Sequence, residues 1–333
     1  MDPITQQTVL AAAGAAKGDP VYVDDVFKTK IYSGNSGSQT ITNGIDLSGE
    51  GGLVWLKARD ANNQEHVLYD SERTFNRGLI SNTGGRDFDS NPPFSSWNNN
   101  GFTLNTSHYA TNNSLLDYVS WTFRKQKGFF DVVTYTGDSS SANQTFNHSL
   151  DSVPGMVIIK NIERPSTDWY VWVPDSITSL EGTLNTLDDF GSQVIGNVTS
   201  TTVQTLYTNQ TATNRNGDKY VCYLFGSGDT RFGANRDESI IKVGSYTGTG
   251  GSHTVNVGFE PGFLMVKRTN GEGNWQVIDN KRSNNRLHWN DTQRENTESA
   301  LALASNGFNV SNDGTYTNGS GSTYLYMVIR KGV

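Results

Sequence analysis

A unit of about 105 residues occurs three times along this 333-residue chain, and its copies stay in register. The clearest marker is an apolar run that ends in lysine, and the three lysines are Lys57, Lys160 and Lys267. These lysines stand 103 and 107 residues apart. Self-similarity at a fixed spacing is the sequence signature of a repeat architecture, so it limits the possible folds more than composition does.

Two further signatures repeat in the same order. A Tyr-Ser/Thr-Gly triplet precedes each lysine run, at residues 32–34, 135–137 and 246–248. An aromatic, alternating strand closes each copy, at residues 118–124, 220–225 and 324–329. Short alternating runs bounded by Gly, Asn, Asp and Ser are typical of antiparallel sheets. We therefore predict an all-β fold, a tandem array of three antiparallel β-sandwich modules with a short N-terminal helix.

The repeats divide the chain into four parts: an N-terminal attachment segment (1–20), module 1 (21–128), module 2 (129–238) and module 3 (239–333). A unit of about 100 residues is large enough to bury a core of its own. The joints between the modules are short, which predicts a semi-rigid rod or a compact cluster in place of loosely tethered beads.

Charge and cysteine content limit the partners and the compartment. The net charge is −7, so no overall field favours nucleic acid or an anionic membrane. The single cysteine, Cys222, lies in an apolar strand, where we expect a buried thiol, and no intramolecular disulfide can form. No apolar run reaches the 18 or more residues that a membrane span requires.

The N-terminal segment carries an alanine-rich apolar stretch at residues 9–16. No Lys or Arg precedes it, so it lacks the positive region of a signal peptide. A helix from about Pro3 to Ala13 is expected, stopped by Gly14. We interpret this segment as an attachment peptide for another protein; the alternatives are a helix packed on module 1 and a frayed end. The residues expected to make the attachment are Ile4, Gln7, Val9, Leu10 and Ala13.

Signatures of catalysis are weak along the whole chain. The five histidines show no metal-ligand spacing, and the glycine-rich stretches precede strands where a phosphate site would need a helix. Adjacent acidic pairs point to opposite faces of a strand and do not make an acid/base dyad. We therefore predict a protein that is not an enzyme and has no catalytic residues and no cofactor.

Two weaker binding sites remain. Asp87, Asp89 and Asn91 are spaced like the start of a calcium loop, but Pro92 replaces the glycine turn and no glutamate follows, so no metal site is expected there beyond a weak candidate. Most aromatic residues fall on strands and are expected in the core. Trp97 and Trp289 stand among polar residues, so they are predicted to be exposed and are candidate glycan contacts.

Several strings extend the repeat pattern into a family resemblance. They are residues 1–7, 22–27, 45–57, 119–124, 128–137 and 154–160. Together they resemble repeat-containing tail and tail-fibre virion proteins of marine tailed bacteriophages, including cyanophages, over essentially the whole chain. The resemblance implies a structural component of the phage particle and supplies no catalytic residues.

From the resemblance and the N-terminal segment we expect a short tail fibre or a fibre/tail adaptor, located in the virion tail and assembled in the bacterial host cytoplasm. Its partners would be other virion proteins, in the tail or near the portal, and a homo-oligomer, with a trimer favoured. The alternatives are a host-surface carbohydrate-binding (receptor-binding) protein and a head decoration protein. A polysaccharide depolymerase is disfavoured because the repeats share no carboxylate pair in a common register.

Overall fold

The computed structural model describes residues 19–333 except 75–76, 88–92, 140–142, 175, 178–180, 192–193, 207–209, 284, 298–299 and 312–315. The predicted N-terminal helix lies outside the described residues. So do the residues expected to make the attachment, which are Ile4, Gln7, Val9, Leu10 and Ala13.

The described part of the chain is nearly all β, as predicted, with two four-residue helices, α2 (Val23–Val26) and α3 (Leu47–Glu50). Its strands form six sheets, and every pairing of these strands is antiparallel. Each sheet takes all its strands from one module, and each module contributes one large sheet and one small sheet.

The sheets of the three modules share one strand order. In module 1 the large sheet is β1 (Phe27–Ser33), β8 (Asp117–Arg124), β3 (Gly52–Ala58), β4 (His66–Asp70) and β5 (Leu79–Ile80), and the small sheet is β2 (Gln39–Thr42), β7 (Gly101–Leu104) and β6 (Phe94–Asn98). In module 2 the large sheet is β9 (Phe130–Thr136), β16 (Lys219–Phe225), β11 (Met156–Asn161), β12 (Tyr170–Trp172) and β13 (Gly182–Thr183), and the small sheet is β10 (Asn143–Asn147), β15 (Thr202–Leu206) and β14 (Ile195–Val198).

In module 3 the large sheet is β17 (Ile241–Thr247), β25 (Thr323–Arg330), β19 (Pro261–Arg268), β20 (Gln276–Asp279), β21 (Asn285–His288) and β22 (Asn296–Thr297), and the small sheet is β18 (His253–Asn256), β24 (Gly307–Val310) and β23 (Leu301–Ala304). The register repeats as well as the order. At the middle of the large sheets the facing pairs are Trp55 with Trp121, Ile158 with Tyr223, and Met265 with Met327.

Each module has a hydrophobic cluster with members from both its large and its small sheet. The paired members include Val54 and Phe102 in module 1, Val157 and Val203 in module 2, and Leu264 and Phe308 in module 3. These clusters account for one face of each large sheet. The apolar residues of the lysine runs alternate between this face and the opposite one, as a strand requires.

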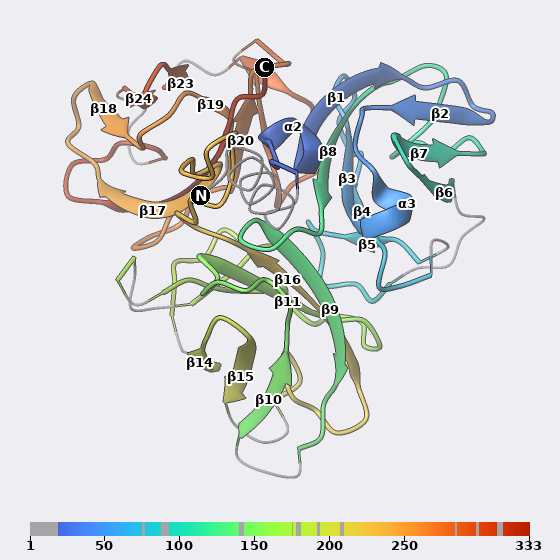
Figure 1. The fold of residues 1–333 in the computed structure, drawn as a ribbon, viewed down its shortest axis with the longest axis horizontal. Helices are drawn as coiled ribbons and strands as arrows, with labels where there is room; N and C mark the ends of the chain where they lie inside the picture. The colour runs from blue at the N-terminus through green and yellow to red at the C-terminus, as the bar shows by residue number, and fades with distance from the viewer. Residues whose placement is uncertain are drawn as a thin grey trace, which may run out of the picture.

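The opposite faces of the three large sheets meet in one central cluster. Phe123 of module 1 lies 5.4 Å from Phe225 of module 2 and 6.5 Å from Phe263 of module 3, measured between ring centroids. Figure 1 shows the modules as three lobes around a common centre. Of the two arrangements left open by the sequence, the compact cluster is the one observed, and the rod is not.

The central cluster also explains why some strands are buried along their whole length. β3 and β11 are buried at every residue. A sheet covered on both faces needs apolar residues at successive positions, which explains the nearly continuous apolar runs before the repeated lysines.

The Tyr-Ser/Thr-Gly triplets tie the edge strand of each large sheet to a loop that precedes the closing strand. Tyr32 Oη donates to the carbonyl oxygen of Thr111 at 2.7 Å. A Cβ added to Gly34 would lie 2.2 Å from the carbonyl oxygen of Asn113, so only glycine allows this close approach. The same tyrosine bonds recur from Tyr135 to Thr213 and from Tyr246 to Thr317.

Candidate functional site: a cleft at one of three module junctions

The repeated lysines join each module to its neighbour. Lys160 is fully buried, and its Nζ donates to the carbonyl oxygens of Thr167 in module 2 (2.9 Å) and Gly84 in module 1 (3.3 Å). An ammonium group has three donors, so it can satisfy loops from two modules at once.

The other two lysines make the equivalent contacts. Lys57 bonds to Gln64 of its own module and Thr292 of module 3, and Lys267 bonds to Gly273 of its own module and Leu187 of module 2. Module 1 therefore contacts module 3, module 2 contacts module 1, and module 3 contacts module 2. The three junctions close into a ring.

Burial of these ammonium groups has an electrostatic cost. Burial lowers the pKa of Lys57, Lys160 and Lys267 to about 8, and the nearby carboxylates offset only part of this effect. The carbonyl oxygens around each Nζ take the place of water.

A second set of contacts repeats beside the lysines. Trp169 Nε1 donates to the carbonyl oxygens of Ile80 and Thr83 across the junction between modules 1 and 2, and Trp275 Nε1 donates to that of Thr183 across the junction between modules 2 and 3. In module 1 the same register position holds His66.

His66 has a structural role in this position. Its Nδ1 accepts a hydrogen bond from Trp55 Nε1 at 3.0 Å. Burial, with the charge of Lys57 nearby, lowers the pKa of His66 well below its ordinary value, so the ring is neutral at physiological pH.

A third set joins the modules nearer the centre. Asp70 Oδ2 accepts from Tyr223 Oη of module 2 at 2.7 Å, and Asp279 Oδ2 accepts from Trp121 Nε1 of module 1 at 3.0 Å. Each of these buried carboxylates is also paired with an arginine three residues later, at 2.7 Å in both cases.

The junction between modules 2 and 3 replaces both partners of the third set by apolar residues. Val173 occupies the position of the aspartates, and Met327 occupies the position of the two ring donors. Donor and acceptor are absent together, so neither is left buried without a partner.

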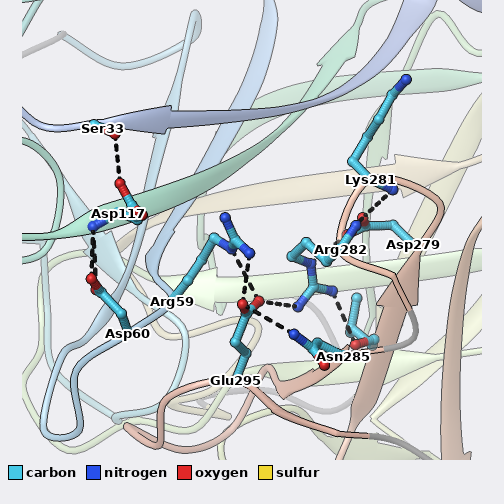
Figure 2. A network of polar contacts seen from close by, with 10 residues as sticks. Ser33, Arg59, Asp60, Asp117, Asp279, Lys281, Arg282, Asn285 and Glu295 are labelled. Carbon is cyan, nitrogen blue, oxygen red and sulfur yellow. Dashed lines mark hydrogen bonds and ion pairs between the residues drawn. The ribbon is translucent and has the colours of Figure 1, made fainter.

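At each junction a carbonyl oxygen of the neighbouring module accepts a hydrogen bond from the repeated lysine. The junctions differ at the residue that lies three positions after this carbonyl group in the sequence. That residue is Glu295, Phe190 or Asp87. Glu295 pairs with Arg59 of module 1 at 2.6 Å through Oε1 and 3.0 Å through Oε2, as Figure 2 shows. Phe190 is buried and packs 6.1 Å from Trp275 between ring centroids. Both residues therefore contact the neighbouring module directly.

The junction between modules 1 and 2 has Asp87 at this position, and it opens into a cleft with a volume of about 470 Å³. Across from Asp87 stands Ile162, at the position that Arg59 and Thr269 hold in the other modules. The described lining residues are Glu72, Arg73, Thr74, Arg77 and Asp87 from module 1, and Thr134, Tyr135, Thr136, Ile162, Glu163 and Lys219 from module 2.

The cleft carries charges of both signs. Asp87 lies 3.5 Å from Arg77 Nη1 and 3.9 Å from Arg73 Nη1. Burial nevertheless raises the pKa of the Asp87 carboxyl, and the nearby charge of Glu163 adds to this shift. Glu163 and Lys219 are exposed on the opposite wall. Such a lining suits a ligand that both donates and accepts hydrogen bonds.

The structure brings only one predicted site residue, Asp87, into this cleft. Its expected companions in a calcium loop, Asp89 and Asn91, lie outside the described residues. Among the residues that are described, no cluster of three or more His, Cys, Asp or Glu side chains could hold a metal ion.

The prediction that Trp289 is exposed is wrong. Its side chain is fully buried in the central cluster and stacks on Trp55 with 4.2 Å between ring centroids. Its neighbours in the sequence are polar loop and strand-end residues, so the sequence around Trp289 does not indicate that its indole lies in the cluster between the modules. Trp97 is half-buried and lies 4.4 Å from Phe94, so it is largely a packing residue.

Cys222 is fully buried, as expected, and burial raises the pKa of its thiol well above the ordinary value. Sequence reasoning missed Arg77, Glu163 and Lys219. The available signal was the difference among Asp87, Phe190 and Glu295, but it becomes visible only when the loops of the three copies are placed in register.

Within the part of the chain that the structure covers, no helix is long and apolar enough to cross a membrane. Comparison with curated proteins gave no match. The sequence model of one protein family matches residues 23–331, which span all three modules, so the chain belongs to the family described as a domain of unknown function, DUF7483.

Proposed function

We propose that this protein is a non-catalytic structural component of a bacteriophage virion, a short tail fibre or a fibre/tail adaptor. In this proposal three β-sandwich modules form one rigid body, and the N-terminal segment attaches that body to the particle. The sequence resemblance provides the assignment to a virion, and the junctions between modules support a structural role.

The observation that carries the proposal is the use of the repeated polar residues. Lys57, Lys160 and Lys267 are buried, and each donates to a neighbouring module. An enzyme built from repeats would be expected to repeat its catalytic side chains. Here the repeated groups stabilise the junctions, which is what a building block requires.

The start of the described chain supports attachment through the N-terminal segment. Val21 packs against the central cluster, and its carbonyl oxygen accepts a hydrogen bond from the Gly233 amide at 2.9 Å. Arg236 Nη2 donates to the carbonyl oxygen of Asp19. Residues 19–21, at the start of the described chain, are therefore held by the joint between modules 2 and 3, and the proposed attachment segment leads directly into this contact.

Purified particles provide the test. Mass spectrometry and immunogold labelling should find the protein in virions, and deletion of residues 2–16 should abolish its incorporation. A matched control, Leu115→Ser at an exposed site on module 1, should be incorporated normally. Absence of the intact protein from particles would contradict the virion assignment. Normal incorporation of the deletion variant would contradict only the attachment role of the N-terminal segment.

A further inference from the structure

The cleft between modules 1 and 2 marks a departure from the internal symmetry of the molecule. The other two junctions are filled at the equivalent position, one by the Glu295–Arg59 ion pair and one by Phe190. In the third, Asp87 and Ile162 line an open cleft of about 470 Å³. This volume falls within the range of about 300–1,000 Å³ that is typical of small-ligand sites.

The open junction lacks packing that is present at the equivalent position of another junction, where Phe190 packs against Trp275. An aromatic residue in this position would bury apolar area and stabilise the junction. The chain has instead a carboxyl group that is half-buried and whose pKa is raised by burial. A position that departs from the stable solution in favour of a polar cavity is typical of a binding site.

The charges of the cleft select the class of ligand. Arg77 and Asp87 stand on the module 1 wall, and Glu163 and Lys219 stand on the module 2 wall. Glu72 and Arg73 also line the module 1 wall, so the lining holds three cations and three carboxylates, and threonine residues 134 and 136 line the same cleft. A free anion would meet three carboxylates, and an apolar ligand would exclude water from the charged groups of the cleft.

A sugar hydroxyl can donate to a carboxylate and accept from a guanidinium or ammonium group at the same time. A molecule with several hydroxyls and no net charge therefore satisfies both walls. We propose that this cleft binds a neutral saccharide, with Arg77, Asp87, Glu163 and Lys219 as its polar contacts. This site is distinct from Trp97 and Trp289, and the proposal does not depend on where the protein is located.

The test uses the full chain on an array of oligosaccharides. The neutral probes contain glucose, galactose, mannose, rhamnose or N-acetylhexosamine, and a second set contains uronates. We expect binding to at least one neutral probe. The double variant Glu163→Ala/Lys219→Ala should weaken that binding about tenfold or more, since two charge-assisted hydrogen bonds are lost.

Two further variants separate loss of the site from loss of the fold. Asp87→Phe places in the open junction the residue type that closes its counterpart, so binding should disappear while the melting temperature is kept or raised. The control Glu260→Ala/Lys331→Ala removes an exposed pair of the same charges in module 3 and should bind like the unaltered protein.

The outcomes are distinct. Binding to no neutral probe, binding to uronates alone, or neutral binding that survives both cleft variants would each overturn the proposal. None of these results would affect the virion assignment, because that assignment is measured by incorporation into particles.

Discussion

At the scale of single residues, the buried lysines tie the stability of the molecule to pH. Burial lowers the pKa of Lys57, Lys160 and Lys267 to about 8, whereas an unfolded lysine titrates near 10.4. Between these values the unfolded chain binds more protons than the folded chain. The free energy of unfolding must therefore rise with pH in this window.

We predict that the free energy of unfolding rises by about 1 kcal/mol per lysine between pH 7 and pH 9. Above about pH 10 it should fall, because burial raises the pKa of Tyr118 to about 12 while unfolded tyrosines ionise near 10. Urea unfolding at half-unit pH steps measures the profile. The variant Lys160→Met should lose about a third of the rise, and the exposed substitution Lys331→Met should keep all of it.

A profile that is flat or falling between pH 7 and pH 9 would contradict this account. The sequence places the three lysines in register at the ends of apolar strands, but nothing in the sequence says that they are buried. A strand-end lysine is ordinarily solvated, and these are buried because a loop from another module covers them.

At the scale of strands and turns, the repeated glycines follow from close backbone approach. A Cβ on Gly137 would lie 2.2 Å from the carbonyl oxygen of Arg215, which belongs to the backbone and has little room to move. We predict that Gly137→Ala destabilises the protein by about 1–3 kcal/mol through overpacking. Gly191 has nothing within 4 Å of such a Cβ, so Gly191→Ala is the matched control and should change the melting temperature little.

Equal melting temperatures for the two glycine variants would contradict this prediction, because they would show that the loop before β16 can move away from the added Cβ without loss of stability. The strands themselves could be predicted from alternation and turn residues, and the runs around Lys57, Lys160 and Lys267 all fall on strands of the large sheets. What alternation could not provide is the second buried face. The cover on that face comes from another module some 100 residues away, and a local pattern carries no record of it.

The central hydrogen bonds show the same limit. Trp121 bonds to Asp279 over a separation of 158 residues, and Tyr223 bonds to Asp70 over 153. Taken alone, each aromatic donor is typical of a core residue, and each aspartate is typical of a turn. The cleft could not be predicted for the same reason, because Asp87 differs from its counterparts only when it is compared with Phe190 and Glu295 at the equivalent positions of the other modules.

At the scale of the whole molecule, the junction between modules 3 and 1 is joined by a partly buried ion pair. The side chains of Arg59 and Glu295 are 18% and 14% exposed, and two hydrogen bonds join them. A double-mutant cycle to alanine should give a coupling free energy of about 1 kcal/mol or more. The exposed Lys331–Glu260 pair should give about 0–0.5 kcal/mol. Equal couplings would contradict a special role for this pair.

The shared central cluster predicts how the modules depend on one another. If each module were self-sufficient, removing module 3 would leave modules 1 and 2 unchanged. The large sheet of module 1, however, carries Trp55 and Phe123, which pack against Trp289 and Phe263 of module 3, and Phe190 of module 2 packs against Trp275. Residues 1–238 alone would expose these rings to water, together with the carbonyl oxygens and the Trp121 indole that module 3 now satisfies. We expect the full chain to unfold in one cooperative transition. The truncated chain should bind the dye ANS, lose near-ultraviolet circular dichroism and melt roughly 10 °C lower, since a chain of 150–250 residues loses about 2–4 °C per kcal/mol. A truncated chain that keeps its near-ultraviolet spectrum and its melting temperature would instead establish three independent modules, because only modules with complete cores of their own could lose a neighbour without consequence.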